Sequence, residues 1–145
     1  MLLNSMSRLS ETNQRYIIGL PAGQFTYKPA ALQFLLSFGL SRLSETNQRY
    51  IIDWPADQFE DKPEALQFLL TKYLSGLSET NQRYIIDLPA DKFIDKPEAL
   101  QSVLKERLDE LPEGTQRYII DLPADQFRNK PAYYWLRNKI QYWST

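Results

Sequence analysis

The sequence repeats itself every 34 residues. Closely similar strings begin at Leu9, Leu43, Leu77 and Leu111 of the 145-residue chain. A repeat period of about 20–50 residues is typical of solenoids, in which each unit buries its apolar face only against its neighbours. About three units are needed for a stable stack. Four copies therefore predict a solenoid or similar array and argue against a single ordinary globular core.

Each copy predicts a first helix that is short. In the copy at 43–76, Ser44 is a natural N-cap, and Glu45 suits the positive end of the helix dipole. Pro55 disfavours helical geometry at Trp54, so this helix is limited to about ten residues. The residues after the proline predict one further helical turn that carries Phe59 into the core.

A second helix follows in the same copy. Asp61 is its expected N-cap, and a proline is tolerated in its first turn. Gly39 and Gly76 are expected to end two of these second helices in left-handed geometry. The apolar residues follow the i, i+3, i+4, i+7, i+8 spacing of an amphipathic helix, and they are Leu66, Leu69, Leu70, Tyr73 and Leu74.

We therefore predict an all-α fold, a right-handed α-solenoid of four 34-residue helix-turn-helix repeats with terminal caps. The second helix of the last copy exchanges leucines for tyrosine and tryptophan, as a capping unit would. The predicted division is a half-helix cap at 1–8, repeats at 9–42, 43–76 and 77–110, and a fourth repeat with the C-terminal cap at 111–145.

The composition argues against catalysis and bound cofactors. Cysteine and histidine are both absent, which removes disulfides, Cys/His metal sites and the commonest nucleophile–base pairs. Aspartates recur, for example at Asp53, Asp57 and Asp61, and could suggest calcium ligands. Because Pro55 interrupts the helix, the spacing of four residues does not place these carboxylates on a common helix face. Helix capping and solvation therefore explain the aspartates more simply. We expect a non-enzymatic protein with no cofactor and no metal ligands.

Hydropathy and charge give expectations about location and partners. No apolar run approaches the roughly 18 residues of a membrane span, and the start has no signal-peptide pattern, so we expect a cytoplasmic protein with no membrane partner. The net charge is +3 over residues 1–42, −8 over 43–125 and +4 over 126–145. An acidic middle with basic ends could complement another copy or a partner.

The most regular polar motif is Gln-Arg-Tyr in the first helix. One interpretation is a repeated peptide- or phosphate-binding surface, because arginine offers five donors in a fixed fork. The alternative is an i, i+4 pair such as Glu45–Arg49, with Tyr50 in the core. The candidate partner-binding residues of this motif are Gln14, Arg15, Gln48, Arg49, Gln82, Arg83, Gln116 and Arg117.

Further candidates are aromatic. Trp54 is one, and the segment from Phe127 onward interleaves basic residues with aromatics. That segment could be a terminal cap, a surface for a partner or for self-association, or a single-strand-binding surface. Its candidate contact residues are Tyr134, Trp135, Tyr142 and Trp143.

The order of motifs within a copy also suggests a family. Leu-Ser-Glu, Tyr-Ile-Ile, Pro, then Lys-Pro-Glu-Ala-Leu-Gln-Phe-Leu-Leu and Gly-Leu resembles the repeats of the mitochondrial transcription termination factor family over residues 9–145. The resemblance implies two helices per repeat and nucleic-acid binding. The acidic middle of this chain departs from what a duplex-binding surface needs.

Two functions follow as hypotheses. The first is a helical-repeat scaffold that mediates protein–protein interaction and self-associates through its aromatic end, with a protein or peptide partner of unknown identity. The alternative is a nucleic-acid-binding repeat protein that uses the recurring arginines and the basic aromatic C-terminus. The two differ in the salt dependence of binding, because phosphate contacts weaken steeply with ionic strength.

Overall fold

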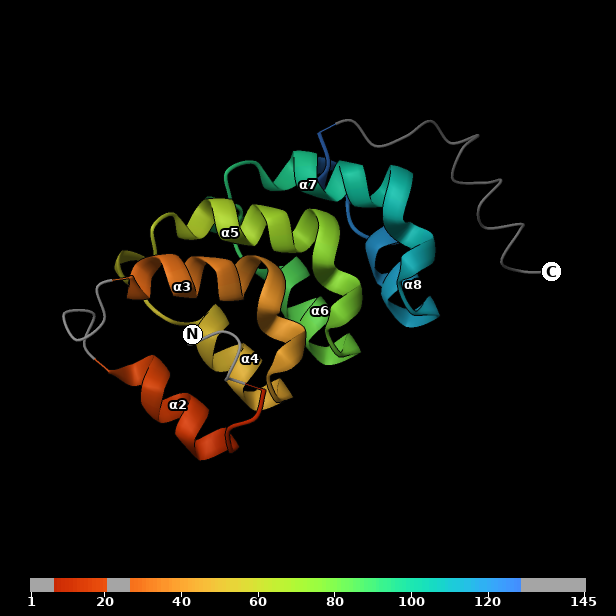
Figure 1. Ribbon diagram of the computed structural model, residues 1–145. Coiled ribbons are helices and arrows are strands. Elements are labelled where there is room, and N and C mark those ends of the chain that lie inside the picture. Colours follow the sequence, from red (N-terminus) through yellow and green to blue (C-terminus); the bar gives the residue numbers. More distant parts are fainter. Residues whose placement is uncertain (1–6, 21–26, 129–145) are drawn as a thin grey trace.

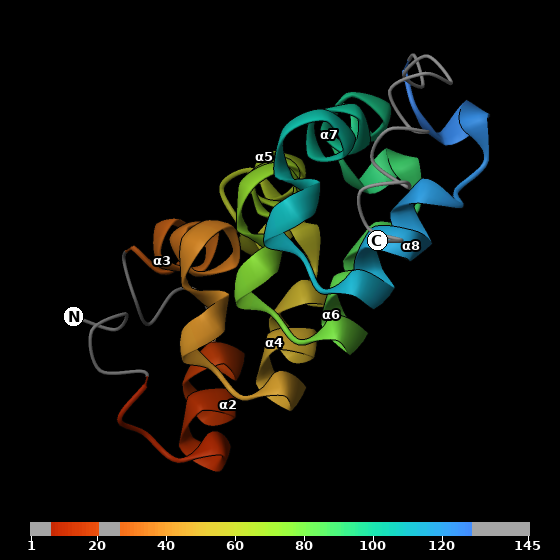
Figure 2. The same ribbon diagram turned by 90° about the vertical axis from the view of Figure 1, so that its right-hand side faces the viewer.

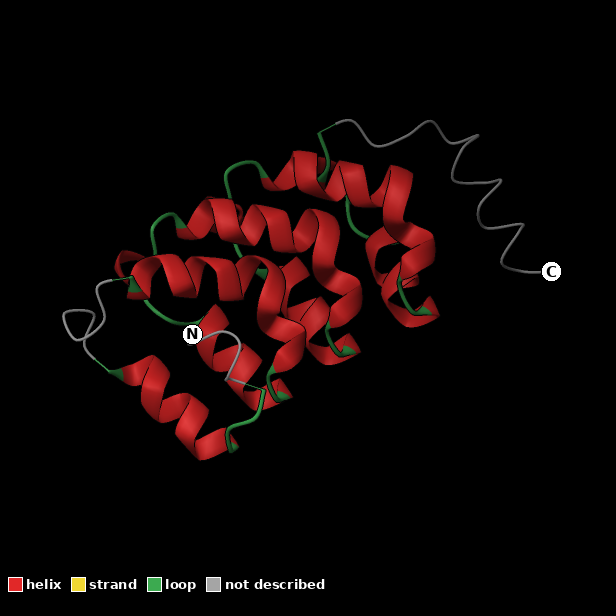
Figure 3. Ribbon diagram, in the orientation of Figure 1, coloured by secondary structure: helices red, strands yellow, loops and turns green. Residues whose placement is uncertain are grey.

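The computed structural model describes residues 7–20 and 27–128. Its helices are α2 (Glu11–Gly19), α3 (Lys28–Phe34), α4 (Glu45–Ile52), α5 (Lys62–Phe68), α6 (Glu79–Asp87), α7 (Lys96–Ser102) and α8 (Glu113–Ile120). No strand occurs within these two ranges (Figure 3). The prediction of an all-α chain is confirmed. Most of the half-helix cap predicted at 1–8 lies outside the described residues.

The helices form two rows (Figures 1 and 2). The first-helix row consists of α2, α4, α6 and α8, and each of these helices contacts the next one in the row. The second-helix row consists of α3, α5 and α7, which follow one another along the other side. Corresponding helices in successive copies begin 34 residues apart, as at α4 and α6 or at α5 and α7.

The first helices begin and end as their sequences predict. Ser44 Oγ accepts a hydrogen bond from Asn47 N (3.2 Å), and Ser10 and Ser78 cap α2 and α6 in the same way. At α8 the capping position is Pro112, which makes no side-chain cap. Pro55, Pro89 and Pro123, which follow α4, α6 and α8, each lead into a short 3₁₀ turn, such as Ala56–Gln58. This turn places Phe59 in the core, as expected.

The second helices change geometry along their length. Asp61 Oδ1 accepts a hydrogen bond from Glu64 N (3.2 Å) and caps α5, which confirms its predicted role. After α5 the chain continues through a π-helical turn, Leu69–Tyr73, and a 3₁₀ turn, Leu74–Gly76. The same sequence of turns follows α3 and α7, at Leu35–Gly39 and Leu40–Arg42 and at Val103–Arg107 and Leu108–Glu110.

Two expectations for the second helices are wrong. Gly39 has φ −107° and not a left-handed value, and the corresponding Tyr73 and Arg107 both have φ −125°. No glycine in the described ranges has a positive φ, because the 3₁₀ turn ends the helix without one. Tyr73 was expected on the buried face but is 40% exposed. The π turn adds a residue to the register, which leaves Tyr73 outside the core, while Leu74, predicted on the same face, is buried as expected.

The core lies between the two rows and is built from aliphatic side chains. Burial of each such side chain stabilises the fold by roughly 1.5–3 kcal/mol, and the inner faces of both rows contribute. The members that are at most 1% exposed include Leu35, Leu36, Ile51, Leu69, Leu70, Ile85, Leu100, Leu104 and Ile119. None of the described helices is long and apolar enough to cross a membrane.

A buried lysine ties the start of each second helix to the end of the first. Lys62 Nζ donates to Trp54 O (2.7 Å), and Lys96 Nζ donates to Leu88 O (2.6 Å). Lys28 makes the same contact with Leu20 O. Burial lowers the pKa of all three amines below the ordinary value. The recurring Lys-Pro dipeptide is thus a connection between helices, with the cation placed at a helix C-terminal end.

Candidate functional site

The recurring polar residues of the first-helix row form a ladder of hydrogen bonds between neighbouring copies. Asn81 Nδ2 donates to Gln48 Oε1 (2.8 Å) and to Glu45 O (3.1 Å). Asn81 Oδ1 accepts from Arg49 Nε (3.4 Å). Ser78 Oγ donates to Glu45 Oε1 (2.6 Å). We call this set of contacts the polar ladder.

The polar ladder is repeated at the two neighbouring junctions. Between α2 and α4, Asn47 Nδ2 donates to Gln14 Oε1 (2.8 Å) and to Glu11 O (3.0 Å). Asn47 Oδ1 accepts from Arg15 Nε (3.3 Å). Between α6 and α8, Thr115 replaces the asparagine and donates to Gln82 Oε1 (2.7 Å). Asn47 and Thr115 are 0% exposed. The bonds from these two side chains to Gln14 and Gln82 therefore lie inside the fold.

The four glutamines of the predicted partner site are buried. Each also uses its amide nitrogen within its own copy, because Nε2 donates to the carbonyl of the leucine five residues earlier. A buried amide with both ends bonded within the chain is a structural element, since leaving either end unpaired costs about 1–3 kcal/mol. Gln14, Gln48 and Gln82 also accept a bond at Oε1 from the next copy, which favours a structural role for these three. Gln116 is bonded through Nε2 alone among the described residues.

The arginines bridge neighbouring first helices and are more exposed. The Arg49 guanidinium lies 3.7 Å from the centroid of the Tyr84 ring, and Arg15 and Arg83 lie over Tyr50 and Tyr118 at 5.4 and 5.6 Å. In the described ranges, the expected i, i+4 ion pair forms only between Glu79 and Arg83, at 3.8 Å. Partner binding by these arginines stays a prediction.

A hollow of about 350 Å³ opens beside the ladder between α4 and α6. It is lined by Glu45, Thr46, Arg49, Thr80 and Asn81. Its lining offers a carboxylate, a guanidinium, hydroxyls and an amide, which is a set suited to polar groups. Arg49 and Asn81 are already bonded to each other there.

The recurring aspartates have separate structural partners. Asp53 accepts a hydrogen bond from Tyr84 Oη, and Asp87 accepts one from Tyr118 Oη. These bonds to a carboxylate are the main reason why the pKa of each tyrosine is raised above its ordinary value. Across residues 7–20 and 27–128, no group of three or more acidic side chains could hold a metal ion.

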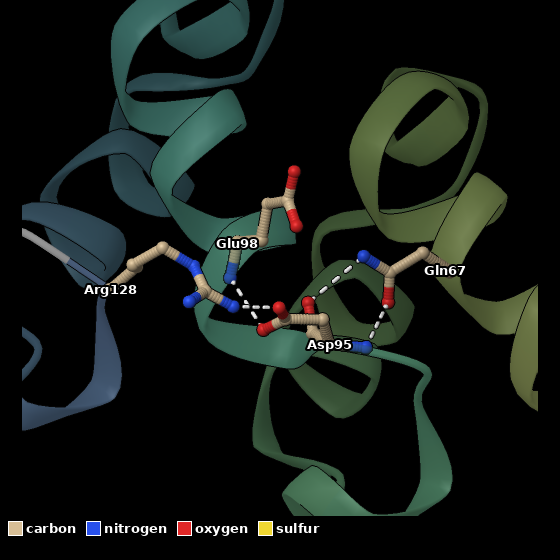
Figure 4. A network of polar contacts seen from close by, with 4 residues as sticks. All are labelled: Gln67, Asp95, Glu98 and Arg128. Carbon is tan, nitrogen blue, oxygen red and sulfur yellow. Dashed lines mark hydrogen bonds and ion pairs between the residues drawn. The ribbon is translucent and has the colours of Figure 1, made fainter.

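A second polar cluster joins three copies at the start of α7 (Figure 4). Gln67 Nε2 donates to Asp95 O (2.9 Å), and Asp95 N donates to Gln67 Oε1 (3.0 Å). The Asp95 carboxylate accepts from Glu98 N (3.1 Å) as an N-cap and pairs with Arg128. Gln33 makes the same two contacts with the backbone of Asp61. These glutamines align each second helix with the next.

Trp54 is partly buried between the two rows. Its ring centroid lies 5.1 Å from that of Tyr50, and Lys28 Nζ lies 5.7 Å from it. Trp54 Nε1 is buried, with no hydrogen-bond acceptor among the described residues. A role of Trp54 in partner binding stays a prediction. The remaining aromatic candidates, Tyr134, Trp135, Tyr142 and Trp143, lie outside the described part of the chain.

The second-helix row and the π turns that continue it carry a group of aromatic side chains at the surface. We call Phe34, Phe38, Phe68 and Tyr73 the aromatic cluster. The ring centroid of Phe38 lies 4.9 Å from that of Phe34, 5.7 Å from Phe68 and 5.3 Å from Tyr73. Phe34 and Phe38 are 45% and 42% exposed. Large apolar side chains that remain exposed in one patch mark interaction surfaces.

Hollows adjoin the aromatic cluster on two sides. One of about 250 Å³ is lined by Phe68 and Lys72 together with α7 residues such as Ala99 and Ser102. Another of about 140 Å³ is lined by Phe38, Tyr73 and neighbouring residues of the turn that follows α5. Members of the cluster thus line both hollows, Phe68 the first and Phe38 and Tyr73 the second.

A signal for the aromatic cluster was present in the sequence. Phe38 corresponds to Lys72 and Glu106 in the next two copies. A position that accepts a phenylalanine, a lysine and a glutamate on the same fold is not a core position, because unpaired charges are almost never fully buried. The helical spacing alone predicts Tyr73 on the buried face.

Comparison with protein-family models, with curated proteins and with solved structures finds no significant match in any of the three. The resemblance to mitochondrial transcription termination factor repeats thus stays a prediction that rests on helix spacing and motif order. The function must be argued from the surfaces of this chain.

Proposed function

We propose that this chain is a right-handed α-solenoid of four 34-residue helix-turn-helix repeats that acts as a non-enzymatic scaffold for protein–protein interaction. The repeat architecture is supported by helices that begin at 34-residue intervals and by hydrogen bonds that recur at the same interval. Each copy contacts mainly the copy before and after it, as the units of a solenoid do.

The aromatic cluster is the observation that carries the binding function. Phe34, Phe38 and Tyr73 are each at least 40% exposed, and all belong to the second-helix row. Aromatic side chains are enriched at the centres of protein interfaces, where they supply large contact areas at little cost in conformational entropy. The adjoining hollows at Phe68 and Tyr73 would receive apolar side chains of the partner.

The charge around the cluster favours a protein segment over a nucleic acid. Residues 43–125, which include Phe68 and Tyr73, carry a net charge of −8, so this part of the chain disfavours a polyphosphate. Lys72 is the only cation that lines the larger hollow, and Glu98 lines it as well. A partner segment with apolar anchors and few acidic residues fits these surroundings.

A peptide-display selection against the folded chain tests this proposal. We expect enrichment of peptides rich in apolar and aromatic residues, with binding lost at least tenfold in Phe38→Ser. The matched control is Ile94→Ser, since Ile94 is also exposed but lies outside the cluster. Failure to enrich any peptide, or equal binding by Phe38→Ser and the parent chain, would exclude the cluster as the binding surface.

Nucleic-acid binding is the second candidate, and one observation favours it. Arg15, Arg83 and Arg117 are exposed on successive parts of the first-helix row. Guanidinium groups spaced along one surface can contact successive phosphates. Gel-shift assays at two ionic strengths decide this candidate: phosphate binding predicts affinity that falls with a log–log slope of about −0.9 per contact on duplex DNA. No retention at low salt would eliminate it.

A further inference from the structure

Each junction of the polar ladder joins side chains of an earlier copy to side chains of the copy that follows it, and we call these two sets the acceptor half and the donor half. The donor half comes from the later copy, and at the junction of α4 and α6 it consists of Ser78, Asn81 and Tyr84. The acceptor half comes from the earlier copy, such as Glu45 and Gln48. Because α2 has no earlier copy and α8 no later one in the described ranges, each end is left with one half.

The donor half at α2 is complete and exposed. It consists of Ser10, Asn13 and Tyr16. Tyr16 is 68% exposed, and Asn13 is exposed although its counterpart Asn47 is 0% exposed. Within residues 7–20 and 27–128, the side chains of Asn13 and Tyr16 have no hydrogen-bond partner.

The acceptor half at α8 is also complete. It consists of Glu113, Gln116, Arg117 and Asp121, which correspond to the residues of α4 and its end that receive α6. Gln116 Nε2 is bonded to Leu111 O (2.8 Å), while Gln116 Oε1, whose counterparts accept from Asn47, Asn81 and Thr115, has no donor among the described residues. Arg117 is exposed.

We infer that α2 of one molecule docks onto α8 of a second molecule and forms one more junction of the polar ladder. Asn13 would donate to Gln116 Oε1 and accept from Arg117 Nε. Tyr16 would lie under the Arg117 guanidinium and donate to Asp121. This inference rests on the proposed repeat scaffold and commits it to one partner, a second copy of this chain.

Two further features fit this partner. Asp121 is present at α8, whereas the corresponding residue at the end of α2 is Gly19, so the new junction would have the tyrosine–carboxylate bond that the α2–α4 junction lacks. The N-terminal 42 residues carry +3 and the middle of the chain −8, which favours the approach of one molecule's start to another's body.

The geometry has a consequence for assembly. The two docking faces differ, so the contact is heterologous and leaves a free face at each end of a dimer. Such contacts extend into open chains unless the rotation between molecules closes a ring. Association should therefore proceed beyond a dimer as the concentration rises.

A mixing experiment with two end-blocked variants tests the inference. The first variant, Asn13→Lys with Tyr16→Ser, blocks the α2 end, and the second, Arg117→Ala with Asp121→Lys, blocks the α8 end. All four residues are exposed, so both variants should keep the helix content of the parent, which circular dichroism verifies. Ser75→Lys, an exposed change in the middle of the chain, is the matched control for added charge.

Light scattering over a concentration series gives the readout. We expect the parent chain and Ser75→Lys to grow beyond dimers, each blocked variant alone to stay monomeric, and an equimolar mixture of the two to form dimers and nothing larger. A parent chain that stays monomeric, blocked variants that still associate, or a mixture that stays monomeric would each overturn head-to-tail docking. Such a failure leaves the peptide selection unaffected, so it does not remove the proposed scaffold function.

Discussion

The two helix rows join their members in different ways. In the first-helix row, buried amides such as Asn47 and Asn81 connect neighbouring copies through several hydrogen bonds each. In the second-helix row, leucines fill the interior, and aromatic side chains such as Phe38 are left at the surface. The polar motif that is nearly identical in all copies is thus internal, and the positions that vary between copies include exposed ones.

This contrast reverses a common expectation. A polar motif repeated along a surface invites interpretation as a binding site, and apolar helix positions invite interpretation as core. Here Gln48 and Gln82 are buried and Phe34 and Phe38 are exposed. Repetition of a residue in every copy indicates a contact that every junction needs, because the same neighbour is present each time.

The largest effect should follow the removal of a ladder asparagine. Asn81→Ala leaves Gln48 Oε1 without its donor and Arg49 Nε without its acceptor, and it removes the additional side-chain bond to Glu45 O. Each buried group left unpaired costs about 1–3 kcal/mol, so we expect the free energy of unfolding to fall by about 2–4 kcal/mol in urea denaturation.

The matched control for that change is Asn13→Ala. Asn13 is the same residue in the first copy but is exposed, so its truncation should change the free energy of unfolding by about 0.5 kcal/mol or less. The measurement is made on the monomer at low concentration. Equal losses in the two variants would refute the buried role of the polar ladder.

Much of the fold could be predicted from the sequence because the signals are local. Ser44 and Asp61 cap helices through their own side chains, and Pro55 limits α4 without help from the tertiary structure. The exposure of Tyr73 could not be predicted in this way. It depends on the π turn Leu69–Tyr73, which shifts the helical register and which the i, i+3, i+4 spacing does not predict.

The candidate site was less accessible to sequence reasoning. The sequence shows the Gln-Arg-Tyr motif but not the side to which its glutamine points. The spacing within one helix does not say whether that side chain faces solvent or the next copy. The partner of Gln48 is Asn81, which lies 33 residues away. Only the stacking of the helices brings these two amides together and makes both of them interior.

A smaller effect is expected when a second-helix glutamine that bonds to the backbone of the next copy is removed. Gln67→Ala removes both contacts with the backbone of Asp95, while Asp95 keeps its capping bond to Glu98 N. We expect a loss of about 1–2 kcal/mol in chemical denaturation. Gln58→Ala serves as a control, since the Gln58 side chain makes no hydrogen bond in the described ranges. An equal loss of stability in Gln58→Ala would show that the effect of Gln67→Ala does not come from its two backbone bonds.

The tyrosine–carboxylate bonds predict a pH dependence. Because the pKa of Tyr84 is raised in the folded state, chiefly by its bond to Asp53, the stability from this bond is present below pH 10.0 and is lost as the pH rises through the folded pKa. The stability difference between the parent and Tyr84→Phe should be about 0.5–1 kcal/mol at neutral pH.

That difference should shrink toward zero above pH 10.0. The buried lysines act in the opposite direction, because their lowered pKa values make stability rise with pH below 10.5. Both chains contain these lysines, so their contribution cancels when the free energy of unfolding of Tyr84→Phe is subtracted from that of the parent at each pH. A difference that stays constant through the alkaline range would contradict the raised pKa of Tyr84.

The smallest effect on stability is expected in the aromatic cluster. Phe38 is exposed. In the described part of the chain, its ring–ring contacts are all with other members of the cluster. Phe38→Ser should therefore lower the free energy of unfolding by about 0.5 kcal/mol or less. A loss above about 2 kcal/mol in thermal or urea unfolding would show that the cluster stabilises the fold and is not a surface available to partners.

The central claim is that the polar ladder joins neighbouring copies from the inside, and a double-mutant cycle between Gln48→Ala and Asn81→Ala tests it most directly. These amides form a buried bond of 2.8 Å across the junction of α4 and α6. The account predicts a coupling free energy of about 1–2 kcal/mol in urea denaturation. Losses that simply add, with no coupling beyond the error of the measurement, would contradict it.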